Sequence, residues 1–114
     1  MRAAVLRRGS QALGPIWVAD GPLSRGLGLV GRRALAEDCA LLLIPCGAIH
    51  TFGMRFVIDV VFLDRRGVII ASHSHVTPWR WAREKKAYAT LEWTAGAIHR
   101  HGLKVGEQLA WSDS

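Results

Sequence analysis

The run of residues 56–63 constrains the fold of this chain more than any other feature of its sequence. It reads Phe-Val-Ile-Asp-Val-Val-Phe-Leu and is rich in the β-branched and aromatic residues that favour strands. Side chains alternate between the two faces of a strand, and here both alternate sets are apolar. The sequence therefore predicts a central strand that is covered on both sides. Asp59 interrupts it, and a carboxylate buried there must be paired, hydrogen-bonded or protonated.

Shorter segments around this strand have the composition of further strands and turns. The turn Asp64-Arg65-Arg66-Gly67 is typical of a hairpin loop with Gly67 in a left-handed conformation, so the chain should return antiparallel after it. Five other segments are expected to be strands: residues 16–19, 40–44, 68–71, 87–93 and 108–111.

Two short helices complete the expected elements. Apolar residues at Leu23, Leu27 and Val30 have helical spacing, which predicts a helix near 22–30. A second helix is expected near 94–101, capped by Thr94 and ended by Gly102. Hairpin spacing without alternating βαβ units favours a mainly β fold, a small antiparallel barrel or sandwich with two short helices.

The length of the chain favours one domain. A chain of 114 residues can bury a hydrophobic core without the help of disulfides or bound metals. Residues 1–114 are therefore expected to form a single domain, with residues 1–14 as a loose or edge segment. The longest apolar run falls well short of the roughly 20 residues that a membrane helix needs. Arg7 and Arg8 interrupt the N-terminal segment before the apolar stretch of a signal peptide could form. We therefore expect a cytoplasmic protein, with Cys39 and Cys46 as free thiols.

The charge balance indicates which partners the chain could attract. Fifteen basic and nine acidic residues give a net charge of +6, which favours an anionic partner such as nucleic acid, an anionic lipid surface or an acidic protein. Charge alone selects none of these, and a basic protein without any such partner is the simpler interpretation.

Three blocks of the sequence carry a resemblance to a known family: Gly28-Leu29-Val30-Gly31-Arg32, the stretch from Ile49 to Asp64, and the stretch from Leu91 to Glu107. In their order, which spans residues 16–111, they resemble the uncharacterised bacterial and archaeal family known as domain of unknown function 192. The segment Ile-His-Thr-Phe-Gly-Met is similar to one subgroup of the family. The chain departs from the family pattern where Val57 replaces Pro, Val30 replaces Met and Glu107 replaces Asp. The resemblance implies a compact, mainly β fold and no established activity.

The first two blocks place polar groups at strand ends beside apolar surface, which is where small barrels hold ligands. This arrangement predicts a ligand pocket lined by Gly28, Leu29, Arg32, His50, Thr51, Met54 and Asp59. Asp59 has two interpretations: it orients His50 or binds a ligand cation, or it locks a loop or turn by accepting backbone N–H bonds.

Cys46, His50 and Asp59 also suggest an enzyme of the hydrolase type, with a nucleophile, a base and an orienting carboxylate. Cys46, His50 and Met54 are soft metal ligands, but Pro45, Gly47 and Gly53 argue against the helix that would align them. The histidines at 73, 75, 99 and 101 are expected at the surface. The sequence therefore predicts no metal site and no cofactor.

Aromatic and basic residues alternate after Pro78. The set Trp79, Arg80, Trp81, Arg83, Lys85 and Lys86 suits stacking on unpaired bases with contacts to phosphates, or contact with an anionic membrane surface. A solvated loop with one Trp folded back onto the core is the simpler alternative.

The preferred function is a non-enzymatic accessory module that binds a small ligand or a protein. The alternatives are the hydrolase and the nucleic-acid or anionic-surface binder. Exposed sheet edges would also allow a homodimer.

Overall fold

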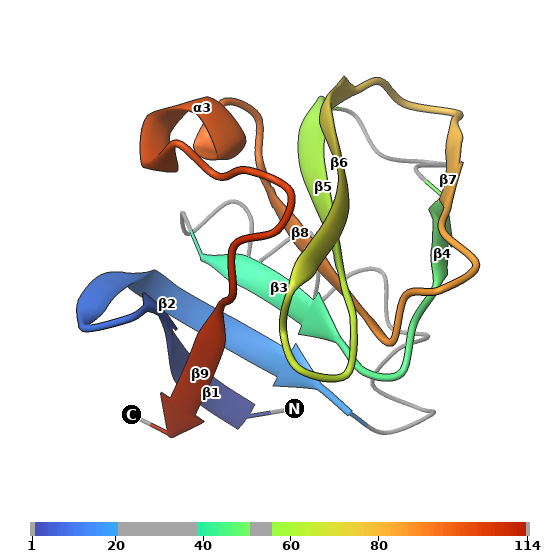
Figure 1. Ribbon diagram of the computed structural model, residues 1–114. Helices are drawn as coiled ribbons and strands as arrows, with labels where there is room; N and C mark the ends of the chain where they lie inside the picture. Colours follow the sequence, from blue (N-terminus) through green and yellow to red (C-terminus); the bar gives the residue numbers. More distant parts are fainter. Residues whose placement is uncertain (1, 21–38, 51–55, 114) are drawn as a thin grey trace.

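The chain folds around a seven-stranded mixed sheet, with a short helix against one face and a two-stranded sheet against the other (Figure 1). The computed structural model describes residues 2–20, 39–50 and 56–113. The strands of the large sheet are β1 (Arg2–Arg8), β2 (Gln11–Ala19), β3 (Ala40–Leu43), β5 (Ile58–Leu63), β6 (Ile69–Val76), β8 (Ala89–Thr94) and β9 (Ala110–Asp113). The small sheet pairs β4 (Ala48–His50) with β7 (Trp81–Arg83), and the helix is α3 (Ala97–His101).

The strand predicted at the centre of the fold is β5, which begins at Ile58 instead of Phe56. It lies between β6 and β8, and all six of its residues are buried. Val61 and Leu63 belong to the apolar cluster that includes Ile98 of α3. Val60 and Phe62 belong to the cluster on the other face, together with Ile49 of β4. The alternation of two apolar sets is thus explained by two separate cores, one on each face of the sheet.

The hairpin after β5 is confirmed. The Gly67 amide donates to the Asp64 carbonyl (3.0 Å), and the Asp64 amide donates to the Val68 carbonyl (3.0 Å). Gly67 has φ +80°, and a Cβ at this position would lie 2.2 Å from the Leu109 carbonyl oxygen. Only glycine fits both the left-handed conformation and this close approach. The strand that follows, β6, extends through the histidine-rich segment to Val76.

The C-terminal helix is also confirmed, but its start differs from the expectation. Thr94 is the last residue of β8 and does not cap the helix; Gly96, with φ +95°, stands at the cap position. Gly102 ends the helix in the left-handed conformation, as expected. The helix predicted near 22–30 lies outside the described residues. Within the described part, no helix is long and apolar enough to cross a membrane.

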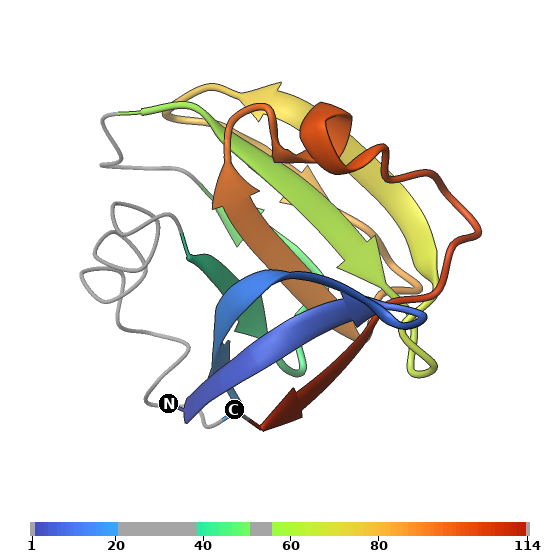
Figure 2. The same ribbon diagram turned by 90° about the vertical axis from the view of Figure 1, so that its left-hand side faces the viewer.

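The expected mainly β fold is confirmed, but the small antiparallel barrel or sandwich expected from the sequence is not confirmed in two respects. First, β2 and β3 are parallel, with Ile16 paired to Ala40. The connection over residues 20–39 is long enough for the crossover that a parallel pair requires. Second, the sheet is not closed into a barrel, because β6 and β9 form its two ends. Figure 2 shows β9, in red, beside β1, in blue, at one end of the sheet. An isolated bridge between Val68 and Gln108 and a hydrogen bond from the Leu109 amide to the Gly67 carbonyl (2.9 Å) link the segments beside the two ends.

The expectation that residues 1–14 form a loose or edge segment is wrong as well. β1 pairs antiparallel with β2 on one side and with β9 on the other, so it is an interior strand. Ala4 and Leu6 are buried in the core on the α3 side. The arginines of this segment lie at the two ends of β1, and the residues between them are apolar, so the basic residues do not prevent the segment from forming a strand.

Candidate functional site

Asp59 is fully buried, and backbone amides are its hydrogen-bond donors. Its Oδ1 accepts from the His75 amide (3.0 Å), and its Oδ2 accepts from the amides of Gly96 (3.2 Å) and Ile98 (2.9 Å). Hydrogen bonds to an ionised carboxylate are roughly twice as strong as neutral ones. The side chain thus ties β5 to β6 and to the start of α3, which is the locking role considered for it from the sequence.

The bond to His75 explains an irregularity in β6. Ile58 pairs with Val76 and Val60 pairs with His73, so two residues of β6 stand opposite Asp59 alone. His75 adopts φ +56°, an uncommon conformation for a residue other than glycine. The carboxylate accepts the amide that this β-bulge removes from the regular ladder. The bulge also ends the alternation that would have placed His73 and His75 on the same face.

Cys46 lies on the other side of the large sheet from the Asp59 carboxylate. Asp59 points to the face that α3 covers, since Ile98 of α3 donates to it. Cys46 packs against the cluster on the opposite face, below β4, and its Sγ donates to the Ala48 carbonyl (3.1 Å). In Figure 1, α3 and the β4–β7 pair flank the sheet on opposite sides. The structure therefore does not bring Cys46 and Asp59 together.

Most residues of the predicted ligand pocket cannot be placed. Gly28, Leu29, Arg32, Thr51 and Met54 lie outside the described residues. The backbone of His50 ends β4, where it pairs with Trp81 of β7. Of the predicted pocket, the structure thus places Asp59, whose carboxylate is occupied by backbone amides, and the strand position of His50.

The aromatic and basic segment after Pro78 lies at the surface as predicted, but it contains a strand. Trp79 is 69% exposed and Trp81 is 67% exposed, so neither indole folds back onto the core. Along β7, Ala82 is buried while Trp81 and Arg83 face outward. The strand geometry therefore presents an indole and a guanidinium on the same outer face.

An open groove of about 600 Å³ runs beside this outer face. It is lined by Gly47, Ala48, Trp81, Arg83, Glu84 and Lys85. The Glu84 amide donates to the Gly47 carbonyl (2.8 Å), which holds the two sides of the groove together. Within the described part of the chain, Arg83 and Lys85 form no ion pair, and together with Glu84 they give the groove lining a net charge of +1.

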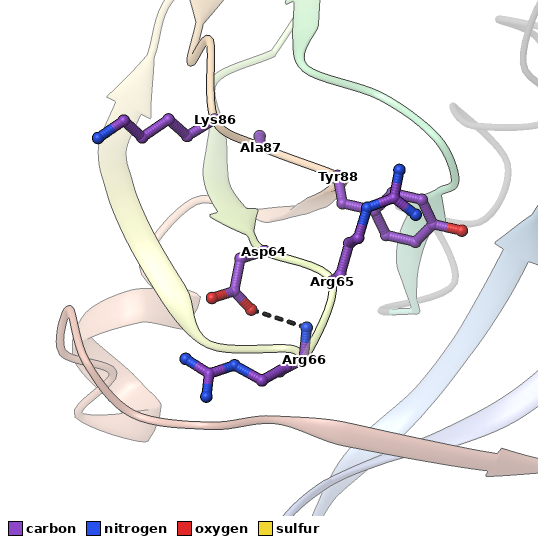
Figure 3. Close-up of a pocket in the computed structure, with 6 residues that line it drawn as sticks. All are labelled: Asp64, Arg65, Arg66, Lys86, Ala87 and Tyr88. Atoms are coloured by element: carbon purple, nitrogen blue, oxygen red, sulfur yellow. Dashed lines mark hydrogen bonds between the residues drawn. The ribbon is translucent and has the colours of Figure 1, made fainter.

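A second pocket, of about 430 Å³, lies at the Asp64–Gly67 hairpin. Figure 3 shows its lining residues: Asp64, Arg65, Arg66, Lys86, Ala87 and Tyr88. The Arg65 guanidinium lies over the Tyr88 ring, with Cζ 4.6 Å from the ring centroid. Residues 84–88 thus separate two basic pockets, and an aromatic side chain lines each of them.

Glu92 is a residue that the sequence interpretation missed as a functional candidate. It lies on β8 between Leu41 of β3 and Val60 of β5, on the sheet face opposite α3. Burial raises the pKa of Glu92 from 4.5 to about 7. No hydrogen bond or ion pair of its side chain occurs within the described residues. The sequence does contain a signal for it, because Glu92 is a charged residue within the predicted strand 87–93, between Leu91 and Trp93.

The described residues contain no group of three or more His, Cys, Asp or Glu side chains that could hold a metal ion. His99 is exposed on α3, and His101 stacks on Trp93 with ring centroids 4.8 Å apart. His73 is exposed and meets the Phe62 ring edge-on at 5.8 Å. These contacts are those of histidines at the boundary of a core.

Comparison with known proteins identifies the family and adds no activity. Among solved structures, a “putative transcription regulator” from Sinorhizobium meliloti 1021 has a TM-score of 0.77 and 23% identity, covering 96% of this chain and 92% of that one. A protein of unknown function from Novosphingobium aromaticivorans DSM 12444 has a TM-score of 0.73 and 16% identity, covering 96% and 84%. At these identities the likeness concerns the fold alone. No curated protein matches the chain. The family model for DUF192, described as “Uncharacterized ACR”, matches residues 4–111, and the chain therefore belongs to this family.

Proposed function

We propose that this protein is a non-enzymatic binding module and that its ligand is single-stranded nucleic acid, held along the outer face of β7. The observation that carries the proposal is the exposed Trp81 indole beside Arg83 on one strand face, at the edge of a groove that Lys85 also lines. An exposed ring offers a stacking surface for any base, and neighbouring cations contact the phosphates between bases. The net charge of +6 adds long-range attraction to a polyanion.

The hydrolase alternative receives less support from the geometry. It needs Cys46, His50 and Asp59 in one cleft, whereas the Asp59 carboxylate lies on the α3 side of the sheet and accepts three backbone hydrogen bonds.

A membrane-surface role is also less favoured. Membrane-interfacial sites present a continuous apolar face, but Arg83 stands beside Trp81 on the outer face of β7.

The test is a fluorescence anisotropy titration with a labelled single-stranded oligonucleotide of about 20 nucleotides, at about 50 and about 200 mM salt. We expect saturable binding in the micromolar range or tighter at the lower salt, weakening steeply at the higher one. Trp81→Ala should weaken binding about tenfold, because base stacking on an aromatic side chain contributes about 1–3 kcal/mol. Arg83→Ala should reduce the slope of log K against log salt by about 0.7, the value for one phosphate of a single strand.

The matched control is Arg100→Ala. Arg100 is an exposed arginine on α3, on the other side of the sheet from β7, and its removal should change neither affinity nor slope. The proposal is overturned if the wild-type protein shows no saturable binding at low salt, or if Trp81→Ala binds as well as the wild type. It is also overturned if anionic lipid vesicles bind in a Trp81-dependent manner while the oligonucleotide does not.

A further inference from the structure

We propose that the pocket at the Asp64–Gly67 hairpin is a phosphate-binding site centred on the Arg65 guanidinium beside Tyr88, with Arg66 and Lys86 adding positive charge to the pocket lining. The phosphate belongs either to the backbone of a bound nucleic acid or to a small phosphorylated compound. The first source rests on the function proposed above, while the site itself does not.

The charge in this pocket suits a phosphate. Three cationic side chains and one carboxylate line it, which leaves a local charge of +2. A phosphate monoester carries about −1.5 to −2 at neutral pH. Within the described residues the three cations form no ion pair, although the charge of Arg66 acts on the Asp64 carboxylate, so Arg65 and Lys86 are the cations that a bound anion would neutralise.

The Asp64 carboxylate does not cancel this attraction. Its Oδ1 accepts the amides of Arg66 (2.8 Å) and Val68 (3.0 Å) and so closes the hairpin (Figure 3). These two hydrogen bonds, with the Val68 bond as the larger cause, hold the pKa of Asp64 below its ordinary value. The carboxylate is thus an ionised part of the turn, and the phosphate is expected at the Arg65 guanidinium, which lies over Tyr88 on the side of the pocket away from the Lys86 side chain (Figure 3).

The hairpin holds its cations on a backbone fixed from several sides. The Leu109 amide donates to the Gly67 carbonyl (2.9 Å), and the Gln108 side-chain amide donates to the Arg66 carbonyl (2.7 Å). The Tyr88 amide donates to the Leu63 carbonyl (2.8 Å), so both walls of the pocket start from the same strand end. Because these contacts are formed before binding, less conformational entropy is lost when the anion is held.

Arg65 is the residue that the structure orients best for this role. Its guanidinium lies over the Tyr88 ring, which reduces its freedom through a cation–π contact. A stacked guanidinium still presents its N–H groups in the ring plane, where they can bind two phosphate oxygens at once. Lysine at this position would keep the charge and lose the two-point contact.

The first arm of the test is an NMR titration of the ¹⁵N-labelled protein with inorganic phosphate, compared with chloride at equal ionic strength. We expect saturable shifts of the amides of residues 64–68 and 86–88 with phosphate only. The double variant Arg65→Gln/Lys86→Gln should weaken binding at least about tenfold, since charge-assisted hydrogen bonds are lost. The matched control Arg100→Gln/Lys104→Gln removes two exposed charges from α3 and the turn after it, and should bind as the wild type does.

Absence of saturable phosphate-specific shifts at these amides overturns the inference, whatever the result with oligonucleotides. Unchanged affinity of the Arg65→Gln/Lys86→Gln variant overturns it too; Arg65→Lys, which leaves the charge in place, gives a second variant in which weakened binding is expected. The second arm repeats the oligonucleotide titration with the double variant. A salt slope reduced by about 1.4 assigns the site to nucleic-acid phosphates. If the slope of the double variant is unchanged while the wild-type protein binds inorganic phosphate at this site, the site is assigned to small phosphorylated compounds.

Discussion

Asp59 and Glu92 lie on neighbouring strands of the sheet, and their carboxyl groups differ in the hydrogen bonds that they accept. Asp59 on β5 points to the α3 side and accepts three backbone amides. Glu92 on β8 points to the other side, between Leu41 and Val60, and burial raises its pKa to about 7. Loss of contact with water favours the protonated form of a carboxyl group that accepts no hydrogen bond, which is the cause of the raised pKa of Glu92.

Glu92 should make the stability of the protein depend on pH. Its pKa is about 7 in the folded state and 4.5 as the reference for the unfolded chain, so the folded state holds the proton more tightly between these values. The associated stability is fully present below about pH 4.5 and is lost as the pH rises through 7. Glu92→Gln, which never ionises, should therefore be more stable than the wild type at about pH 8, by on the order of 3 kcal/mol.

Urea denaturation of both proteins between about pH 4 and pH 8 measures this difference. The two free energies of unfolding should converge at the acidic end and separate progressively above it. A constant difference across the whole range would contradict a raised pKa for Glu92. Glu84→Gln, in the segment between β7 and β8, serves as the control for a general loss of negative charge.

At the scale of elements, Asp59 is the junction of β5, the bulge in β6 and the start of α3. Its hydrogen bonds connect β5 to β6, the next strand along the chain, and to the start of α3, which follows β8. This explains why a carboxylate is placed in the most apolar strand of the protein. The strand supplies the position, and the two irregular segments supply the amides.

Asp59→Asn should destabilise the fold, because an amide nitrogen replaces one acceptor oxygen and faces a backbone N–H. We expect a loss of about 3 kcal/mol in the free energy of unfolding, the range for hydrogen bonds to a buried charged group. The matched control is Asp113→Asn, since Asp113 is 80% exposed at its side chain and lies 3.4 Å from Arg2; it should change stability by less than about 0.5 kcal/mol. If Asp59→Asn unfolds at the wild-type denaturant concentration yet loses ligand binding, the locking role is wrong and Asp59 belongs to a binding site.

At the scale of the whole molecule, two apolar cores share one sheet. The α3 side and the β4–β7 side are packed against opposite faces of β3, β5 and β8. Strands that contribute to both cores can open only when both cores open. The small sheet packs against one core only, and β9 pairs only with β1 in the large sheet, so these elements can open locally.

Hydrogen exchange should follow this arrangement. We expect the slowest backbone amides in β5 and β8, which are interior strands with buried residues on both faces. The amides of β7 and β9 should exchange much faster, since β7 belongs to a two-stranded sheet and β9 lies at the end of the large one. Amide exchange followed by NMR measures each strand in one experiment. Protection of β9 equal to that of β5 would contradict the two-core description.

Local patterns in the sequence predicted the features that depend on a few consecutive residues. These include the central strand, the hairpin that Gly67 closes and the stop of α3 at Gly102. Each is specified by local backbone preference or by alternation along one strand. Thr94 shows the limit of such signals, because a capping residue beside a strand can simply continue that strand.

Only the tertiary structure decided which elements meet. The sequence by itself determined that Asp59 is buried in a strand with two apolar faces, and that aromatic and basic side chains gather after Pro78. It did not determine that β2 and β3 run parallel, that β1 is an interior strand or that Cys46 and Asp59 face opposite ways. Strand order and the choice of face depend on long-range packing, which no local pattern encodes. The partners of Asp59 were therefore settled by the bulge in β6 and the start of α3, which lie 16 to 39 positions away along the chain.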